Sequence, residues 1–234
     1  MAVTESSVAV RGRRALSPIQ RALYASQQRH PRSPLQNMVR LTHIDGPVEP
    51  TRLAEAFAQV VAASDVLRTR IGTEGGTETV VRLSDEPAVS EIVEVPRADA
   101  RRWAEDRAAD ALPLARRAHD SAVLVHEDGT ISWYLALHHC VTDATSSSLV
   151  FGLTAAAYEG ASPSVESYYD WAQRIAEPGP AVDRAARHWA DRPPAPRIGH
   201  LYEQHLATTP ASTRVPVAID DQLAAALAGR LESD

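Results

Sequence analysis

The chain of 234 residues contains no lysine, so its 24 lysine-plus-arginine positions are all arginines. Schiff-base catalysis needs the lysine amine, and the Walker A phosphate loop needs a lysine that reaches the phosphates. The sequence therefore excludes both of these chemistries.

Cysteine and long apolar runs are also scarce. Cys140 stands alone, which excludes an internal disulfide and an all-cysteine metal site and agrees with a reducing compartment. No apolar run is long enough to span a bilayer, and the N-terminal stretch MAVTESSVAVRGRRALS lacks the apolar segment of a signal peptide. We therefore expect a cytoplasmic protein without a membrane segment.

The charged residues form no basic block. The formal net charge is -6, which argues against a dedicated nucleic-acid surface. The one short basic run is RGRR at Arg11 to Arg14. We interpret this run as solvated and residues 1–15 as a flexible tail.

Two helices and several strands are predicted in the first half of the chain. Ser17 as an N-cap and Pro18 at the first helical position predict a helix that ends near His30. Apolar residues at helical spacing predict a second helix after Pro50, with Leu53, Ala56, Phe57, Val60 and Val61 on its buried face. Strands are expected at 37–45, 66–72, 77–83 and 91–95, and an arginine-rich helix at 97–112.

The second half carries the clearest local signal. Two apolar segments flank Asp128-Gly129, a dipeptide typical of hairpin turns, which predicts an antiparallel pair over 119–139. A helix with a hydroxyl cap is expected from Thr145 to Gly160, and shorter helices at 168–176 and 181–190.

These elements predict an α/β fold with a mixed β-sheet sandwiched by helices. Residues 16–190 form one lobe, and the proline-rich stretch beginning DRPPAPRIG at Asp191 opens a linker, residues 191–212. Residues 213–234 read as a strand and a helix that begin a second lobe or a docking tail.

Two adjacent histidines end the predicted hairpin. Strand alternation places His139 on the face of Trp133, Leu135 and Leu137, and His138 on the opposite face. A shared metal site is not expected, because the two rings diverge and no HExxH pattern is present. The plain structural alternative is a histidine pair whose nitrogens are satisfied by backbone groups inside the sheet.

Two nucleophilic mechanisms are also disfavoured. No GxSxG elbow is present, and Ser146 to Ser148 read as the start of a helix, which argues against a Ser-His-Asp hydrolase. Cys140 follows His139 directly, but neighbouring strand residues point apart, so a thiol activated by this histidine is not expected.

The segment His138 to Asp143, HHCVTD, matches the pattern HHxxxD. The surrounding sequence also contains LSPIQRALYASQQRHPRSPLQN, GPVEPTRLAEAFAQVVAASDVLRTRI, LPLAR and the stretch from YYDWA to RHWAD, in this order around it. Together these segments resemble the condensation-domain superfamily of nonribosomal peptide synthetases. The resemblance implies a chloramphenicol-acetyltransferase-like lobe.

The resemblance assigns roles to six residues. It implies that His139 faces the reaction centre, while His138 and Asp143 are structural and Asp143 pairs with an arginine, Arg68 being the best candidate. Ala144 stands where the family has glycine and Ser146 where it has serine, and both are expected along the substrate channel. No metal is implied.

The implied reaction is attack by an amine or hydroxyl on an acyl thioester, which an acyl or peptidyl carrier protein holds on its phosphopantetheine arm. No directly bound cofactor is implied. The likeness covers a first lobe and the start of a second, and the DFGWG-like loop of the second lobe is absent. We therefore expect a split or truncated two-lobe enzyme that needs a second polypeptide. The alternatives are a non-catalytic module that docks a carrier protein or tailoring enzyme, and a coenzyme-A-dependent acyltransferase.

Overall fold

The computed structural model describes residues 11–74, 78–176, 179–190, 192, 220–221 and 223–224. The chain divides into two units, Met1–Ala195 and Pro196–Asp234. In the second unit, the Asp220 carboxylate accepts a hydrogen bond from the backbone N of Leu223. Most of the predicted linker and of the predicted strand and helix after it lies outside the described residues.

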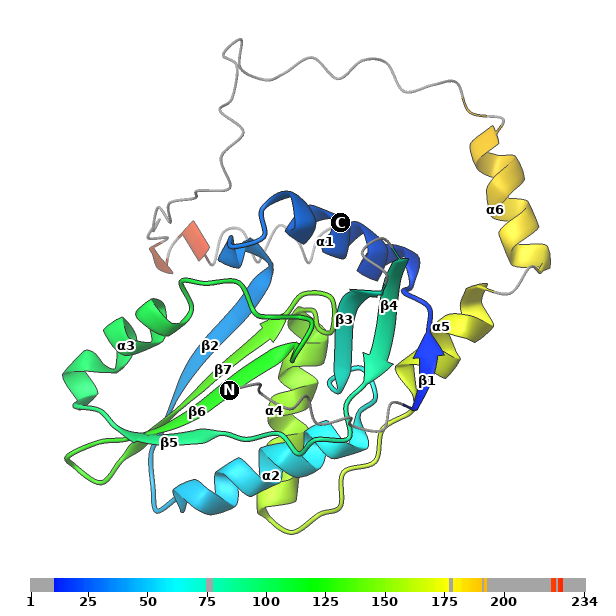
Figure 1. Cartoon of the computed structure of the whole chain (residues 1–234). Coiled ribbons are helices and arrows are strands. Elements are labelled where there is room, and N and C mark those ends of the chain that lie inside the picture. Colours follow the sequence, from blue (N-terminus) through cyan, green and yellow to red (C-terminus); the bar gives the residue numbers. More distant parts are fainter. Residues whose placement is uncertain are drawn as a thin grey trace, which may run out of the picture. The chain divides into compact units, whose positions relative to one another are not determined.

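Two sheets form the framework of the first unit (Figure 1). The larger sheet has the strand order β2 (Asn37–Ile44), β7 (Ile131–His138), β6 (His119–Val125) and β5 (Glu91–Glu94). Its first three strands are antiparallel and β5 runs parallel to β6, so the sheet is mixed, as predicted. The smaller sheet is antiparallel, with the order β1 (Arg11–Arg14), β4 (Glu78–Leu83) and β3 (Thr69–Glu74).

The predicted hairpin is confirmed as β6 and β7. Gly129 has φ +78° at the turn, a conformation that glycine adopts without steric cost. The Asp128 carboxylate accepts a hydrogen bond from the backbone N of Thr130 at 2.9 Å. All eight residues of β7 are buried, which requires that both faces of the sheet be covered.

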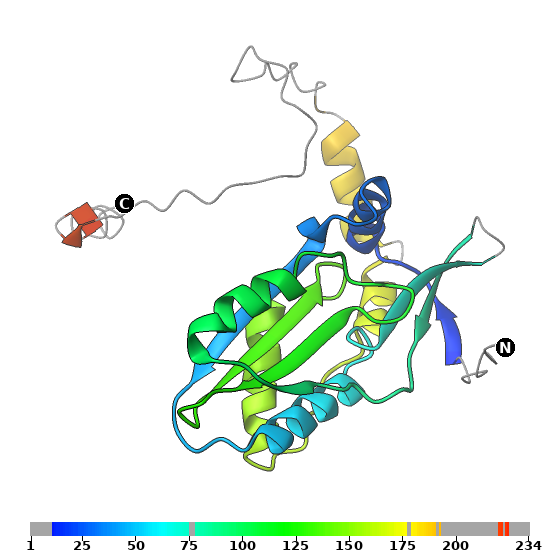
Figure 2. The ribbon, with the colours of Figure 1, turned by 60° about the vertical axis from the view of Figure 1, so that its left-hand side comes forward.

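Helices cover these two faces. One core joins α2 (Pro50–Ala63) and α4 (Ala144–Tyr158) to the side of β7 that carries Trp133 and Leu135. The other joins α3 (Ala100–Arg107) to Tyr134 and Ala136 on the opposite face. The two ribbon views show α3 on one side of the larger sheet and α2 and α4 on the other (Figures 1 and 2). The five residues predicted to form the inner face of α2 are all buried.

Three further helices agree with the sequence. Helix α1 (Pro18–Arg29) starts with a capping box, in which Ser17 and Gln20 exchange side-chain to backbone hydrogen bonds. Helices α5 (Tyr168–Ala176) and α6 (Pro180–Ala190) follow α4, and short 3-10 turns lie at Pro34–Gln36 and Arg97–Asp99.

One N-terminal prediction is wrong. Arg11–Arg14 is not part of a tail but forms β1, which pairs antiparallel with β4. Strand pairing uses backbone N–H and C=O groups, so a charged run can form an edge strand although its side chains show no strand pattern. In the part of the chain that the structure describes, no helix is long and apolar enough to cross a membrane.

Candidate active site

The histidine pair lies where β7 ends and a tight turn begins. The strand finishes at His138, so the predicted alternation stops one residue before His139. The backbone N of His138 donates to the Ala118 oxygen at 2.9 Å, and that of His139 donates to the Gln36 oxygen at 2.7 Å. Two segments distant in sequence therefore fix the position of the turn.

The His139 ring is exposed and has a defined tautomer. Its Nδ1 lies 2.8 Å from the backbone oxygen of Thr142. A carbonyl oxygen only accepts hydrogen bonds, so Nδ1 carries the proton in this contact. In the neutral ring, Nε2 then has a lone pair and can accept a proton from a substrate.

The His138 ring is fully buried, and both of its nitrogens are engaged. Nε2 lies 3.2 Å from Oε1 of Gln27, and Nδ1 accepts the backbone N–H of Cys140 at 3.1 Å. Burial, with a smaller contribution from the charge of His139, lowers the pKa of His138 to about 4. A neutral ring with two internal partners holds the turn together and does not transfer protons at neutral pH.

Cys140 is also inaccessible. Its side chain is buried, and burial raises the pKa of the thiol to about 12. The thiolate is the nucleophilic form of cysteine, and it is scarce at neutral pH when the pKa is this high. Covalent catalysis by this thiol is therefore disfavoured, in agreement with the sequence argument.

An apolar cavity of about 450 Å³ opens beside His139. Residues from α1, α2, α4 and the segment leading into α5 form its walls, among them Leu23, Val60, Val150, Leu153 and Val165. Val60 and Val150 also belong to the core on the Trp133 face of the sheet. His139 therefore lies on the side that strand alternation indicated, at the wall of a space large enough for a small acyl group.

Ser146 and Ala144 differ in their relation to this cavity. Ser146 lines it, whereas Ala144 is the exposed first residue of α4 and lies outside the lining. The expected place of Ala144 and Ser146 along a substrate channel stays a prediction. The helical backbone of Ala144 also shows why alanine can occupy the position without strain.

Asp143 does not pair with Arg68, and this prediction is wrong. Asp143 is exposed, and its Oδ1 accepts the backbone N–H of Ser146 at 2.7 Å as the N-cap of α4. This hydrogen bond is the main reason that the pKa of Asp143 is lowered. The aspartate, not a hydroxyl residue at Thr145, therefore caps the helix, and a solvated carboxylate needs no buried cation.

Arg68 lies in a different environment. Its guanidinium donates to the Ser84 oxygen at 3.3 Å and lies 3.5 Å from Oδ1 of Asp85. These partners follow β4, next to the start of β3. Arg68 is therefore held at the smaller sheet and does not line the cavity of His139.

The cap assignment predicts a small stability effect. Asp143→Ala should lower the free energy of unfolding by about 1 kcal/mol, the usual loss for an N-cap, and not by the 3–5 kcal/mol of a broken buried ion pair. Asp143→Asn keeps a capping oxygen and should stay close to wild type. Urea denaturation of both variants measures the difference, and a cost near 4 kcal/mol for both would restore the ion-pair interpretation.

Two glutamines of α1 support the turn, and the sequence argument did not assign them. Nε2 of Gln20 donates to the Cys140 oxygen at 3.0 Å, and Gln27 reaches His138 as described. Both are buried although polar. Their spacing of seven residues on one face of the predicted helix was the available signal, since a buried face that carries amide side chains needs hydrogen-bond partners.

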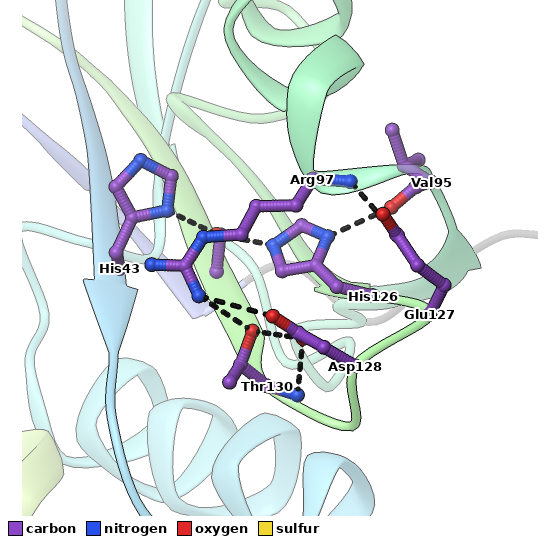
Figure 3. A network of polar contacts seen from close by, with 8 residues as sticks. His43, Val95, Arg97, His126, Glu127, Asp128 and Thr130 are labelled. Atoms are coloured by element: carbon purple, nitrogen blue, oxygen red, sulfur yellow. Dashed lines mark hydrogen bonds and ion pairs between the residues drawn. The ribbon is translucent and has the colours of Figure 1, made fainter.

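A serine hydroxyl contacts two histidine rings at the other end of the sheet (Figure 3). The Ser132 Oγ is 2.6 Å from Nε2 of His126 and 2.6 Å from Nδ1 of His43, and the Val95 oxygen accepts from Nδ1 of His126 at 2.7 Å. Ser132 has no exposed surface. Its hydroxyl cannot reach a substrate, so the contact joins β2, β7 and the turn after β6 without serving as a nucleophilic pair.

The described residues contain no group of three or more histidine, cysteine, aspartate or glutamate side chains that could hold a metal ion. The polar groups at the apolar cavity come from His139, Asp143 and Ser146, and from other lining side chains: Gln20, Ser64, Thr142, Glu166 and Tyr168.

Comparisons with known proteins identify a family and similar folds for this chain. A family model described as Condensation domain matches residues 10–229. The fold resembles the first condensation domain of the calcium-dependent antibiotic synthetase, at 23% identity and a TM-score of 0.64, over 78% of this chain and 49% of that one. It also resembles the starter condensation domain of rhizomide synthetase, at 24% identity and a TM-score of 0.66, over 77% and 48%. A comparison with curated proteins finds no match.

The mixed sheet with helices on both faces and the histidine turn at its edge define a chloramphenicol-acetyltransferase-like α/β lobe. The chain belongs to the condensation-domain family. It spans about half the length of the solved condensation domains described above.

Proposed function

We propose that the chain is the histidine-bearing lobe of a condensation-type acyltransferase. In this proposal an amine or hydroxyl attacks an acyl thioester that a carrier protein presents on its phosphopantetheine arm. The observation that carries the proposal is the position of His139, an exposed ring beside an apolar cavity with its Nδ1 fixed by the Thr142 carbonyl.

His139 would act as a general base. Its Nε2 takes the proton of the attacking amine or hydroxyl while the new bond forms at the thioester carbonyl. The carbon–sulfur bond then breaks, and the proton passes to the departing thiolate, so the histidine ends neutral. Help of this kind is typically worth about a hundred- to ten-thousand-fold in rate. No acyl-enzyme is needed, which is consistent with the burial of Cys140 and Ser132.

The cavity is open on one side, and three large apolar side chains on its lining are exposed: Ile19, Leu149 and Trp171. Exposed apolar side chains that cluster around a cavity are typical of a partner surface. This supports the proposal that a complementary C-terminal lobe covers the cavity, and in our proposal a second polypeptide carries that lobe.

Reconstitution tests this proposal. The chain would be purified alone and after co-expression with a polypeptide that carries a condensation-type C-terminal lobe. Each preparation would receive a carrier protein loaded with a panel of acyl groups, together with amine and hydroxyl acceptors, and products would be identified by mass spectrometry. We expect product only when both lobes are present.

Two other outcomes would contradict parts of the proposal. Turnover by the chain alone at the same rate would remove the need for a second lobe. Co-elution with the carrier protein in size-exclusion chromatography, without product from either preparation, would favour the non-catalytic docking module.

A further inference from the structure

A second cavity, of about 380 Å³, lies beside the smaller sheet and is rich in arginine. It is bounded by the start of β3, the loop after β4 and the segment that leads into β6. Glu86 is the one acidic residue of its lining. Four arginines contribute to the lining: Arg68, Arg70, Arg116 and Arg117. This cavity shares no polar lining residue with the His139 cavity, and no arginine lines the His139 cavity.

Two of these guanidinium groups have buried donors without acceptors. The Nε atoms of Arg68 and Arg70 are buried and have no hydrogen-bond partner. A buried donor without an acceptor is unfavourable, and in native structures such a group usually has a water or an ion beside it. Both residues line the cavity. Their Nε atoms are closed to solvent, so a ligand in the cavity would contact the partly exposed remainder of the two side chains.

The carboxylates near the cavity do not neutralise all four of its arginines. Arg70 pairs with Glu86, and Arg117 lies 3.2 Å from Oδ1 of Asp120. Asp120 is shared, because Arg107 also binds it with two hydrogen bonds. Arg116 is exposed and has no ion-pair partner among the described residues. Arg107 also pairs with Glu91, so Arg107 and Arg117 share two carboxylates, and Arg68 pairs with Asp85. Among the lining guanidinium groups, that of Arg116 is thus the uncompensated one.

His119 adds a polar but uncharged wall. Burial, and then the positive charge of Arg117, lower its pKa to about 4. At neutral pH the ring is neutral and can accept or donate a hydrogen bond. The site therefore does not depend on histidine protonation for its charge.

We propose that this arginine-lined cavity binds a phosphate group. The planar guanidinium fork donates pairs of parallel hydrogen bonds to tetrahedral oxyanions, and several forks around one anion add specificity for a doubly charged ligand over a carboxylate. The ligand is either inorganic phosphate or the terminal phosphate of a small ester. The inference is independent of acyl transfer and requires no second lobe.

Isothermal titration calorimetry of the full chain tests it, with ionic strength held constant by sodium chloride. Inorganic phosphate, methyl phosphate and acetate are the probes. We expect phosphate to bind, and Arg116→Ala to weaken its binding about tenfold or more, the loss of one charge-assisted hydrogen bond. Binding of methyl phosphate with similar affinity would identify the ester as the ligand class, and exclusion of it would identify free phosphate.

Arg101→Ala is the matched control, since Arg101 is an exposed arginine on α3 that pairs with Glu105 and does not line the cavity. Its phosphate affinity should equal that of wild type. Arg70→Gln provides a second test at a buried donor, with circular dichroism to verify folding. Absence of phosphate binding, equal binding of acetate, or an equal loss in Arg101→Ala would overturn the proposal.

Discussion

His139→Ala should lower the rate of acyl transfer about a hundred- to ten-thousand-fold while leaving the fold intact. The loss follows from the removal of the ring whose Nε2 is placed to accept a proton, since general-base help is worth this range. The fold should survive because His139 is exposed: alanine retains the backbone hydrogen bond to Gln36 and loses only the side-chain hydrogen bond to the Thr142 oxygen. The rate would be measured with the reconstituted two-lobe enzyme and a carrier-loaded thioester.

His30→Ala is a suitable control. His30 is an exposed histidine at the C-terminal end of α1, outside the His139 cavity. Its variant should turn over like wild type. A folded His139→Ala protein with wild-type turnover would show that the histidine pair serves only the structure of the turn.

Phe57→Ala should destabilise the protein by about 3–5 kcal/mol, as large-to-small changes at buried phenylalanines do. Phe57 lies on α2 and has no exposed surface. Its ring packs edge-on against His119 at 5.7 Å and Trp133 at 5.6 Å between ring centroids. Its removal leaves a cavity between helix and sheet that rigid neighbours cannot fill. Chemical denaturation measures the loss.

The other phenylalanine provides an internal comparison. Phe151 on α4 is half-buried, with its ring 4.5 Å from that of Trp133 and the Arg40 guanidinium 4.7 Å above it. Because solvent already reaches part of this ring, Phe151→Ala should cost clearly less than Phe57→Ala. Equal losses at the two positions would contradict the assignment of Phe57 to the centre of the core.

Much of the fold was predictable because its signals are local. The spacing of apolar residues identified the inner face of α2, Ser17 and Pro18 marked the start of α1, and Asp128-Gly129 marked the hairpin. Each of these depends on the preferences of residues close together in the sequence. The resemblance to condensation domains, drawn from motifs in family order, was confirmed by the family match.

The predictions that were wrong concern partners distant in sequence. Arg11–Arg14 has the composition of a tail, but β4 supplies a backbone edge for it. Asp143 and Arg68 were expected to meet, yet each has nearer partners: the N-terminus of α4 for one, and the loop after β4 for the other. Charged side chains take the best available partner, and sequence does not tell which groups lie within reach.

The sequence by itself determined the elements, the class of fold and the histidine to examine, because hydrophobic period, turn residues and caps act over a few residues. The tertiary structure decided which nitrogen of His139 carries the proton, because the Thr142 oxygen is brought to it by a turn held between α1 and the segment just before β6. It also decided that four arginines surround one cavity. Both results depend on chain segments that meet only when the core of the sheet and its helices has packed.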